Sequence, residues 1–345
     1  MPSRAETRTL LVSLQGIGNN ILALPLASAL SRRDGALVDM LVLSPRAAAL
    51  LRRHAAVGGV IAAGGRRLAL IPALRSKRYR EAVFAFPCGA KSLILAAAAG
   101  IRRRLGIFHP SLGSAGALLT RRAAYRHGLH DLEHNAFVAE LAGADWDLAR
   151  DWPPFRPADG DVEAARQFLI GRGADPEALF VGLHPGCDES FLEKRWPERG
   201  FASLAKTLYE TRGLASVVFD GPAEPGAGRR IARLAGTPVY PMDGWGDLAG
   251  ALGMLAFCEL FVSGDSGLMN LAAAAGVPTL AIFGPSAPAR TRPFGDAHRV
   301  VAPDRPCRPC HGIEAYRGCL HPAHPCLEDV PLENVAALAG EMLMR

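Results

Sequence analysis

The sequence predicts an α/β protein with two Rossmann-like domains, each built around a parallel sheet. Two units of strand, glycine-rich turn and helix support this prediction. One spans residues 9–30, and the other spans 254–283, where a second strand closes a βαβ unit. A proline-rich segment at 146–160, WDLARDWPPFRPADG, lies between them and has the composition of a linker. A chain of 345 residues is long enough for two such domains.

The first half of the chain alternates short strands and helices. The apolar strand TLLVSL (9–14) is followed by the turn GIGNN and by a helix at 21–30. Strand-like and helix-like segments then continue to residue 108, which is typical of an α/β sheet. Residues 129–142 are predicted to form an amphipathic helix, and the histidines on it or just before it are expected to be solvated rather than metal-bound. These histidines are His127, His130 and His134.

The second half repeats the pattern. Asp161 is expected to cap a lead-in helix, and LFVGLHPG (179–186) begins the second sheet. We therefore predict four parts: a first domain, a linker with the lead-in helix, a second domain with a cysteine-rich loop at 307–326, and a final helix with Pro331 near its first turn. Their expected bounds are 1–152, 153–178, 179–330 and 331–345.

The charge is distributed unevenly. Residues 1–150 carry 21 Lys and Arg against 9 Asp and Glu, a net charge of +12, whereas the remainder carries 18 against 24, a net charge of −6. The basic half favours an anionic partner such as a phosphorylated glycolipid, a membrane surface or a nucleic acid. The alternative is that arginine serves only as a solvated surface residue. Arginines between residues 75 and 122 could gather at one mouth of the sheet, but few aromatic residues accompany them, so we expect no nucleic-acid partner.

The composition also bears on location. No apolar run reaches the length of a membrane span, and the first residues lack the apolar core of a secretory signal. We expect a cytoplasmic protein, and its basic half could also contact an anionic membrane surface.

The most informative stretch is GDSG at 264–267. It follows an apolar strand and precedes a small-residue helix, so it lies where ligands bind in parallel sheets. Glycines allow close approach of backbone to a ligand, Asp265 or Ser266 can cap the helix, and its first N–H groups suit a phosphate. The alternative is a well-capped turn with no ligand. The N-terminal GIG lacks the third glycine of a dinucleotide fingerprint, which argues against NAD or FAD.

Four segments stand out when the whole chain is taken in order: GIGNN (16–20), KRWP (194–197), the GPAE step (221–224) and GDSGLMNLAAAAGVPTLAIFGPS (264–286). In this order they resemble the motifs of the bacterial heptosyltransferase family, glycosyltransferase family 9. This resemblance implies the GT-B fold, in which two Rossmann-like domains face a central cleft. The second domain would hold a nucleotide-diphosphate sugar, by implication ADP-heptose, and the first an anionic acceptor such as phosphorylated lipopolysaccharide core. The implied reaction is an inverting transfer in one displacement, without a catalytic metal or other cofactor.

The resemblance also implies residue roles. Lys194 and the helix that begins near Ser266 would stabilise the departing diphosphate, and Asp265 would hold the sugar or phosphate in place. Glu224 is placed to accept hydrogen bonds from ribose hydroxyls. The expected donor-binding set is Ser266, Gly267, Asn270, Glu224 and Ser286, and the expected acceptor-binding residues are Gly18 and Asn20.

Two positions depart from the family pattern. Asn270 stands where the family usually has histidine, and Asn19 stands at the family's aspartate, thought to deprotonate the acceptor hydroxyl. A carboxamide is no base near neutral pH, although it can orient a hydroxyl by hydrogen bonding. The nearest motif-borne carboxylates that could act instead are Asp188, Glu189 and Glu193. Slow catalysis, or binding of a nucleotide sugar without catalysis, are the other outcomes. A family member that glycosylates a protein or another polysaccharide is a further alternative.

Four of the seven cysteines fall within twenty residues. Cys307, Cys310, Cys319 and Cys326 have the spacing C-x2-C-x8-C-x6-C, with His311, His321 and His324 among them. In a cytosolic protein this pattern favours a structural zinc or iron site over disulfides. Reduced thiols that simply pack a loop are the alternative.

Overall fold

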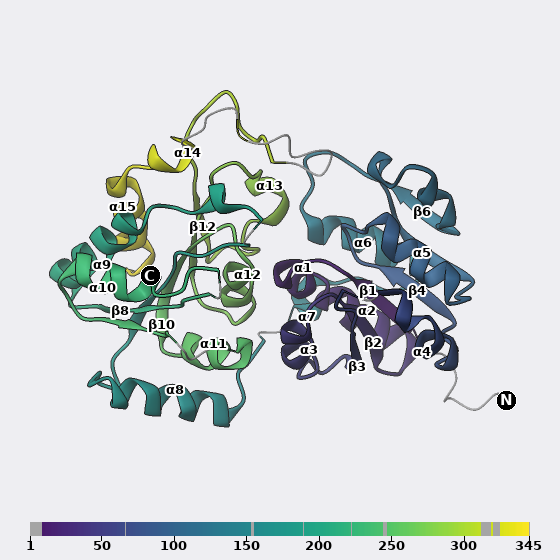
Figure 1. The fold of residues 1–345 in the computed structure, drawn as a ribbon, viewed down its shortest axis with the longest axis horizontal. Coiled ribbons are helices and arrows are strands. Elements are labelled where there is room, and N and C mark those ends of the chain that lie inside the picture. The colour runs from purple at the N-terminus through teal and green to yellow at the C-terminus, as the bar shows by residue number, and fades with distance from the viewer. Residues whose placement is uncertain are drawn as a thin grey trace. The chain divides into compact units, whose positions relative to one another are not determined.

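The computed structural model describes residues 9–65, 67–152, 155–188, 190–221, 223–243, 247–311, 319 and 325–344. The chain divides into two compact units, Met1–Pro153 and Pro154–Arg345. Figure 1 shows that helices cover the sheet of each unit. Each unit is described below by itself.

The first unit has a six-stranded parallel sheet in the order β3-β2-β1-β4-β5-β6. Its central strands β1 and β4 are fully buried, as their apolar sequences predict. The strands are β1 Thr9–Ser13, β2 Val38–Val42, β3 Val57–Ala62, β4 Glu81–Phe84, β5 Arg103–Phe108 and β6 Arg121–Ala124.

The helices of the first unit cover this sheet. Helices α4 and α5 pack on β1 and β4. Leu74 and Leu93 of these helices share a core with Leu10 and Phe84 of the strands. The helices are α1 Ile17–Leu22, α2 Leu24–Asp34, α3 Pro45–Leu51, α4 Ile71–Ser76, α5 Ala90–Ala98, α6 Asp131–Ala142 and α7 Leu148–Asp151, with 3-10 turns η1 Arg67–Leu70 and η2 Pro110–Leu118.

Two arginines of this unit lie at the edge of the sheet where the strands begin. Arg103 and Arg121 begin β5 and β6, and Arg103 pairs at 3.4 Å with the buried Glu81, which begins β4. All strands are parallel, so these residues gather at one mouth of the sheet, as expected. That mouth is opposite to the carboxyl edge, where ligands of parallel sheets bind.

The expectation of solvated histidines is wrong for two of the three. His130 and His134 are buried, with 3% and 0% of their surface exposed. His130 is the N-cap of α6, and its ring nitrogen accepts a hydrogen bond from the Leu132 N–H, while Glu133 accepts one from the His130 N–H. His134 stacks on Phe86 with ring centroids 4.2 Å apart. Sequence spacing did not reveal this because the helix packs on the ends of β4 and β5 rather than facing water.

The second unit repeats the topology with strand order β12-β11-β10-β7-β8-β9, again all parallel. In both units the first and fourth strands of the unit are central neighbours, which is the Rossmann order. The strands are β7 Phe180–His184, β8 Ala215–Val218, β9 Val239–Pro241, β10 Cys258–Gly264, β11 Thr279–Ile282 and β12 Arg299–Val301.

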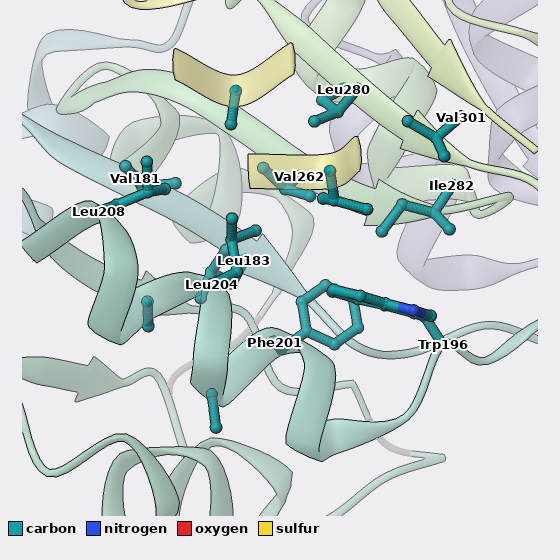
Figure 2. Close-up of a cluster of buried hydrophobic side chains, with 14 of the residues drawn as sticks. Val181, Leu183, Trp196, Phe201, Leu204, Leu208, Val262, Leu280, Ile282 and Val301 are labelled. Carbon is teal, nitrogen blue, oxygen red and sulfur yellow. The ribbon is translucent and has the colours of Figure 1, made fainter. Parts of the chain in front are cut away.

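One large core fills the space between this sheet and helices α9, α10 and α15. Figure 2 shows Phe201, Leu204 and Leu208 of α9 against Leu183 and Val262 of the sheet. The helices of this unit are α8 Asp159–Gly171, α9 Glu198–Arg212, α10 Ala227–Ala235, α11 Leu248–Leu255, α12 Gly267–Ala274, α13 Pro288–Thr291, α14 Pro325–Glu328 and α15 Leu332–Met342, with the 3-10 turn η3 Leu192–Lys194.

Helix ends differ slightly from the sequence expectation. Asp161 does not cap α8, which begins two residues earlier. It lies in the first turn and accepts a hydrogen bond from the Ala158 N–H. Within the described ranges, no helix has the length and apolar character needed to cross a membrane.

Candidate functional site

The candidate donor site lies at the switch point of the second sheet. β7 and β10 are neighbours there, and the connections that leave their carboxyl ends run to opposite sides. Ligands of open α/β sheets bind in the crevice outside such a point. The KRWP segment follows β7 and the GDSG turn follows β10, so two motifs separated by about 70 residues in sequence meet at this crevice.

An ion pair joins the two motifs. The ammonium nitrogen of Lys194 lies 2.7 Å from Oδ2 of Asp265, and the side chains are only 14% and 11% exposed. The Thr291 hydroxyl lies 3.4 Å from the other carboxylate oxygen of Asp265. The Phe191 ring lies beneath the ammonium, 5.1 Å from its centroid. The cation is therefore held in a fixed place by a carboxylate and an aromatic face.

The GDSG turn needs its first glycine. A Cβ at Gly264 would lie 2.9 Å from the Lys194 carbonyl oxygen, so a larger residue would push the two loops apart. Ser266 is the N-cap of α12, and its hydroxyl accepts from the Met269 N–H at 3.2 Å. Other N–H groups of the first turn, including that of Gly267, point out of the helix end beside Asp265 and suit an anion. Asn270, one turn further, is 4% exposed.

A second ion pair holds Glu224. Arg195 donates to Oε2 of Glu224 at 3.1 Å, and the Gly221 N–H donates to Oε1 at 2.9 Å. A Cβ at Gly186 would lie 1.7 Å from the same Oε1, so only glycine fits there. The carboxylate is 6% exposed and fixed in orientation.

His184 and Cys187 lie next to these pairs. Burial lowers the pKa of His184 to about 4, so the ring is neutral at pH 7, and its Nδ1 donates to the Phe219 carbonyl at 2.7 Å. Burial raises the pKa of Cys187, and Arg195, Glu224 and Lys194 all act on it. Both ion pairs are thus close to this one thiol.

An apolar anchor holds the cations in place. Trp196 follows Lys194 and Arg195 directly, is 4% exposed, and packs edge-on against Phe201 with ring centroids 5.0 Å apart. Figure 2 shows the two rings side by side at the edge of the core. A Cβ at Gly200 would lie 2.6 Å from the indole. The buried indole fixes the loop, and therefore the two cations that precede it.

The segment after β11 closes another side of the site. Ser286 is 6% exposed, and its hydroxyl has no hydrogen-bond partner among the described residues. It forms a β-bridge with His311, whose N–H donates to Pro285 O at 3.1 Å. The His311 ring lies 4.3 Å from that of Phe191. Burial lowers the pKa of His311, Lys194 lowers it further, and Asp265 opposes this, so the histidine is part of the same electrostatic environment.

The predicted acceptor-side residues lie in the first unit, in helix α1 after β1. Gly18 and Asn19 are half-buried, whereas Asn20 is 0% exposed. The Asn20 amide donates to the carbonyl of Ser13 at 2.7 Å and to its hydroxyl at 2.8 Å. Its side chain therefore fixes the turn after β1 from inside. The Asn19 amide nitrogen lies 3.4 Å from Oδ2 of Asp131.

A cavity of about 810 Å³ also lies at the carboxyl edge of the first sheet. It is formed by the ends of β2 and β3, the turn η1 and the first half of α5. Arg67 and Lys91 give it positive charge, while Leu68 and Ile94, which are 69% and 48% exposed, give it an apolar side.

Comparison with known proteins agrees with this geometry. Residues 67–321 match the model of glycosyltransferase family 9 (heptosyltransferase). Lipopolysaccharide heptosyltransferase 2 of Escherichia coli K12 is 30% identical over 260 residues, which cover 69% of each chain. The chain belongs to glycosyltransferase family 9. The resemblance seen in the four motifs is thereby confirmed, and this family 9 chain is a glycosyltransferase, which favours an enzyme over a protein that only binds.

Solved structures support the fold of this family 9 member. The structure of the E. coli ADP-heptose lipopolysaccharide heptosyltransferase II has a TM-score of 0.75 at 24% identity, covering 98% of this chain and 99% of that one. The E. coli heptosyltransferase WaaC with ADP has a TM-score of 0.71 at 21% identity, covering 97% and 100%. The predicted GT-B fold is confirmed.

Some residues of the candidate site were not predicted to belong to it. They are Arg195, Phe191, Thr291 and His311, which all contact predicted residues. Arg195 and His311 each lie in a sequence motif, KRWP and the cysteine-rich segment, whereas Phe191 and Thr291 carry no signal in the sequence. Of the substitute bases considered, Glu193 is buried next to Lys194, Asp188 accepts from the Ser190 N–H, and Glu189 lies outside the described residues.

The four cysteines of the cysteine-rich loop are free thiols. Burial raises the pKa of Cys310, and Cys319 and Cys307 raise it further, so these thiols are neighbours. Cys326 is buried, and the other three also act on its pKa. In the part of the chain that the structure describes, no three His, Cys, Asp or Glu residues are arranged to hold a metal ion. His321 and His324 lie outside that part.

Proposed function

We propose that this family 9 enzyme transfers a heptose from ADP-heptose to a lipopolysaccharide-core or related glycan acceptor. The observation that carries this proposal is the Lys194–Asp265 pair at the switch point of the second sheet, next to the N-terminus of α12. A diphosphate needs a cation and convergent N–H donors, and this crevice offers both. The names of the relatives supply the sugar and the nucleotide.

In the proposed reaction the acceptor oxygen bonds to the anomeric carbon while the bond from that carbon to the diphosphate oxygen breaks. The electron pair leaves with ADP, the proton of the acceptor hydroxyl passes to water, and the sugar configuration inverts. Lys194 and the N–H groups of α12 stabilise the negative charge that grows on ADP. Glu224, held by Arg195, accepts hydrogen bonds from the ribose. Asp265, Ser266, Gly267, Asn270 and Ser286 complete the proposed donor site, and these chain groups perform the reaction without a catalytic metal.

The acceptor is proposed to bind at the carboxyl edge of the first sheet, near Gly18 and Asn19. The cavity with Arg67 and Lys91 supports an anionic acceptor, and its exposed Leu68 and Ile94 suit the apolar part of a glycolipid. The excess positive charge of residues 1–150 supports a cytoplasmic enzyme with peripheral contact at the inner face of the inner membrane. We expect no nucleic-acid partner.

The test is ligand-dependent thermal stabilisation with ADP-, GDP- and UDP-sugars, followed by a transfer assay with ADP-heptose and heptose-deficient lipopolysaccharide. ADP-sugars should raise the melting temperature of the wild type, and of Asp265→Ala less, because a ligand stabilises the fold that binds it. Asp296→Ala, an exposed aspartate of the same unit, is the matched control and should behave as the wild type. Equal shifts for all nucleotides, or equal shifts in Asp265→Ala and wild type, would contradict the donor site.

We also propose that Cys307, Cys310, Cys319 and Cys326 bind a structural zinc or iron ion. The support is the C-x2-C-x8-C-x6-C spacing, because four thiolates form a donor set that both metals accept. The described residues do not place three of these thiols around one point, so metal binding would have to draw them together. Elemental analysis of purified protein should give about one metal per chain by this coordination rule, and Cys307→Ser should lose it. Cys258→Ser, which removes a thiol buried in the second sheet, is the control. A metal-free wild type would contradict the proposal.

A further inference from the structure

Asn19 and Asp131 come together from opposite ends of the first unit's sequence. Asn19 lies in α1, directly after the central strand β1, and Asp131 is the first residue of α6. The Asn19 amide nitrogen is 3.4 Å from Oδ2 of Asp131. Asp131 is 0% exposed, whereas Asn19 is half-buried. Asn19 therefore lies between a buried carboxylate and the carboxyl edge of the sheet.

The register of the two helices is fixed independently. Asn135, one turn after Asp131 and also fully buried, donates to the Leu22 carbonyl at the end of α1 at 3.0 Å. The Phe86 N–H donates to the Asn135 amide oxygen at 2.8 Å, which ties α6 to the end of β4 as well. The contact of Asn19 with Asp131 is thus part of a built junction of α1, α6 and β4 rather than a chance approach of two surface side chains.

The chemistry of this pair fixes the direction of the amide. The NH₂ group of Asn19 faces Asp131, and a carboxylate oxygen accepts the hydrogen bond that this group donates. The amide oxygen Oδ1 of Asn19 then points away from Asp131, and no described residue donates a hydrogen bond to it. A hydroxyl donor at the carboxyl edge of β1 would find this oxygen as its acceptor.

We propose that Asp131 is a positioning residue that orients the Asn19 amide, so that Asn19 Oδ1 accepts a hydrogen bond from the attacking hydroxyl of the acceptor. This inference rests on the proposed function, because it takes the acceptor to bind at the first unit. The carboxylate acts through Asn19 and does not itself touch the acceptor. The pair needs one carboxylate and one carboxamide. A chain with these two groups exchanged between positions 19 and 131 should keep more activity than a chain with two carboxylates.

The test exchanges the two groups. Asn19→Asp installs the aspartate that the family resemblance implies at this position, but in this chain it places two carboxylates next to each other and removes the NH₂ donor. We therefore expect kcat/KM for the acceptor to fall about tenfold or more. Asp131→Asn leaves an amide that can bond Asn19 in either direction, and kcat/KM should fall severalfold, mostly through kcat. The double variant Asn19→Asp/Asp131→Asn again has one donor and one carboxylate, and it should recover activity beyond that of Asn19→Asp alone. Glu140→Gln, an exposed acid of the same helix, is the control.

Two measurements distinguish a positioning role of Asp131 from a failure of the proposed function. Melting temperatures of the four proteins form a double-mutant cycle, in which the double variant should be more stable than Asn19→Asp. Thermal stabilisation by ADP should be the same in all of them, because the nucleotide binds the second unit. A wild type that transfers no heptose would overturn the proposed function. A wild type that does transfer, with single effects that simply add in activity or in melting temperature, would overturn the role of Asp131.

Discussion

Lys194 and Asp265 meet 2.7 Å apart although 71 residues separate them in the chain. Each follows one of the two central strands of the second sheet, so the parallel topology brings them to the same edge. In the reaction that we propose, an incoming diphosphate would replace Asp265 as the partner of the Lys194 ammonium. This relationship gives the most direct prediction for the activity.

Replacing Lys194 with alanine should lower kcat by about 100-fold, the usual effect of removing one group that stabilises transition-state charge. Steady-state kinetics with ADP-heptose and heptose-deficient lipopolysaccharide would measure it. Lys206→Ala is the matched control, because Lys206 lies on α9 with its side chain 55% exposed and pairs with the exposed Glu210. Equal kinetics of the two variants would remove Lys194 from the mechanism.

Gly186→Ala should weaken nucleotide binding. The new methyl carbon would lie 1.7 Å from the present position of Oε1 of Glu224. The carboxylate must therefore move and lose its hydrogen bond with Arg195 or with the Gly221 N–H. We expect the dissociation constant for ADP, measured by calorimetry, to rise about tenfold, the loss of one hydrogen bond to a charged group. Gly160→Ala on α8, where a methyl group has open space, should bind ADP as the wild type does. An unchanged affinity in Gly186→Ala would contradict the role of Glu224.

Stability should fall as the pH is lowered from 7 towards 4. Burial lowers the pKa of His184, His54 and His298 to about 4 in each case. Between their ordinary pKa near 6.5 and 4, the unfolded chain binds protons that the folded chain does not, so each histidine lowers the free energy of unfolding by about 1.4 kcal/mol per pH unit at most. Urea unfolding at several pH values would measure the slope. His184→Gln should have a shallower slope than the wild type, and identical slopes would show that His184 does not contribute.

Removing Glu81 should destabilise the first unit strongly. This carboxylate is 2% exposed and pairs with Arg33 and with Arg103 at the start of the sheet. Its loss leaves the mostly buried Arg33 with Asp34 as its remaining carboxylate partner and frees the part-exposed Arg103 to bind water, so Glu81→Ala should cost about 1.5–3 kcal/mol, the value of hydrogen bonds to a charged group. Chemical unfolding followed by circular dichroism would measure the cost. Glu163→Ala on α8, whose carboxylate is 61% exposed, should change stability by less than about 1 kcal/mol. A similarly small effect at Glu81 would mean that the arginines find other partners.

The sequence by itself determined the secondary structure and the family, through residues close together in the chain. Apolar strands, glycine turns and capped helices specify alternating strands and helices, because backbone propensity and burial pattern act over a few residues. The motifs at 194–197 and 264–286 also identify the family from the sequence alone, because a phosphate site needs particular residues at close spacing. Ser266 as a helix cap and Glu224 in a loop after a strand could both be named in advance.

The tertiary structure decided which distant residues meet. The contacts of Asn19 with Asp131, of Phe191 with His311 and of Arg195 with Glu224 join segments whose separation in the chain gives no signal. It also decided that His134 is buried and that the arginines of β5 and β6 mark the amino edge of their sheet. The physical reason is that strand order and helix packing set these distances, and they depend on how whole elements bury their apolar faces rather than on the residues next to each side chain.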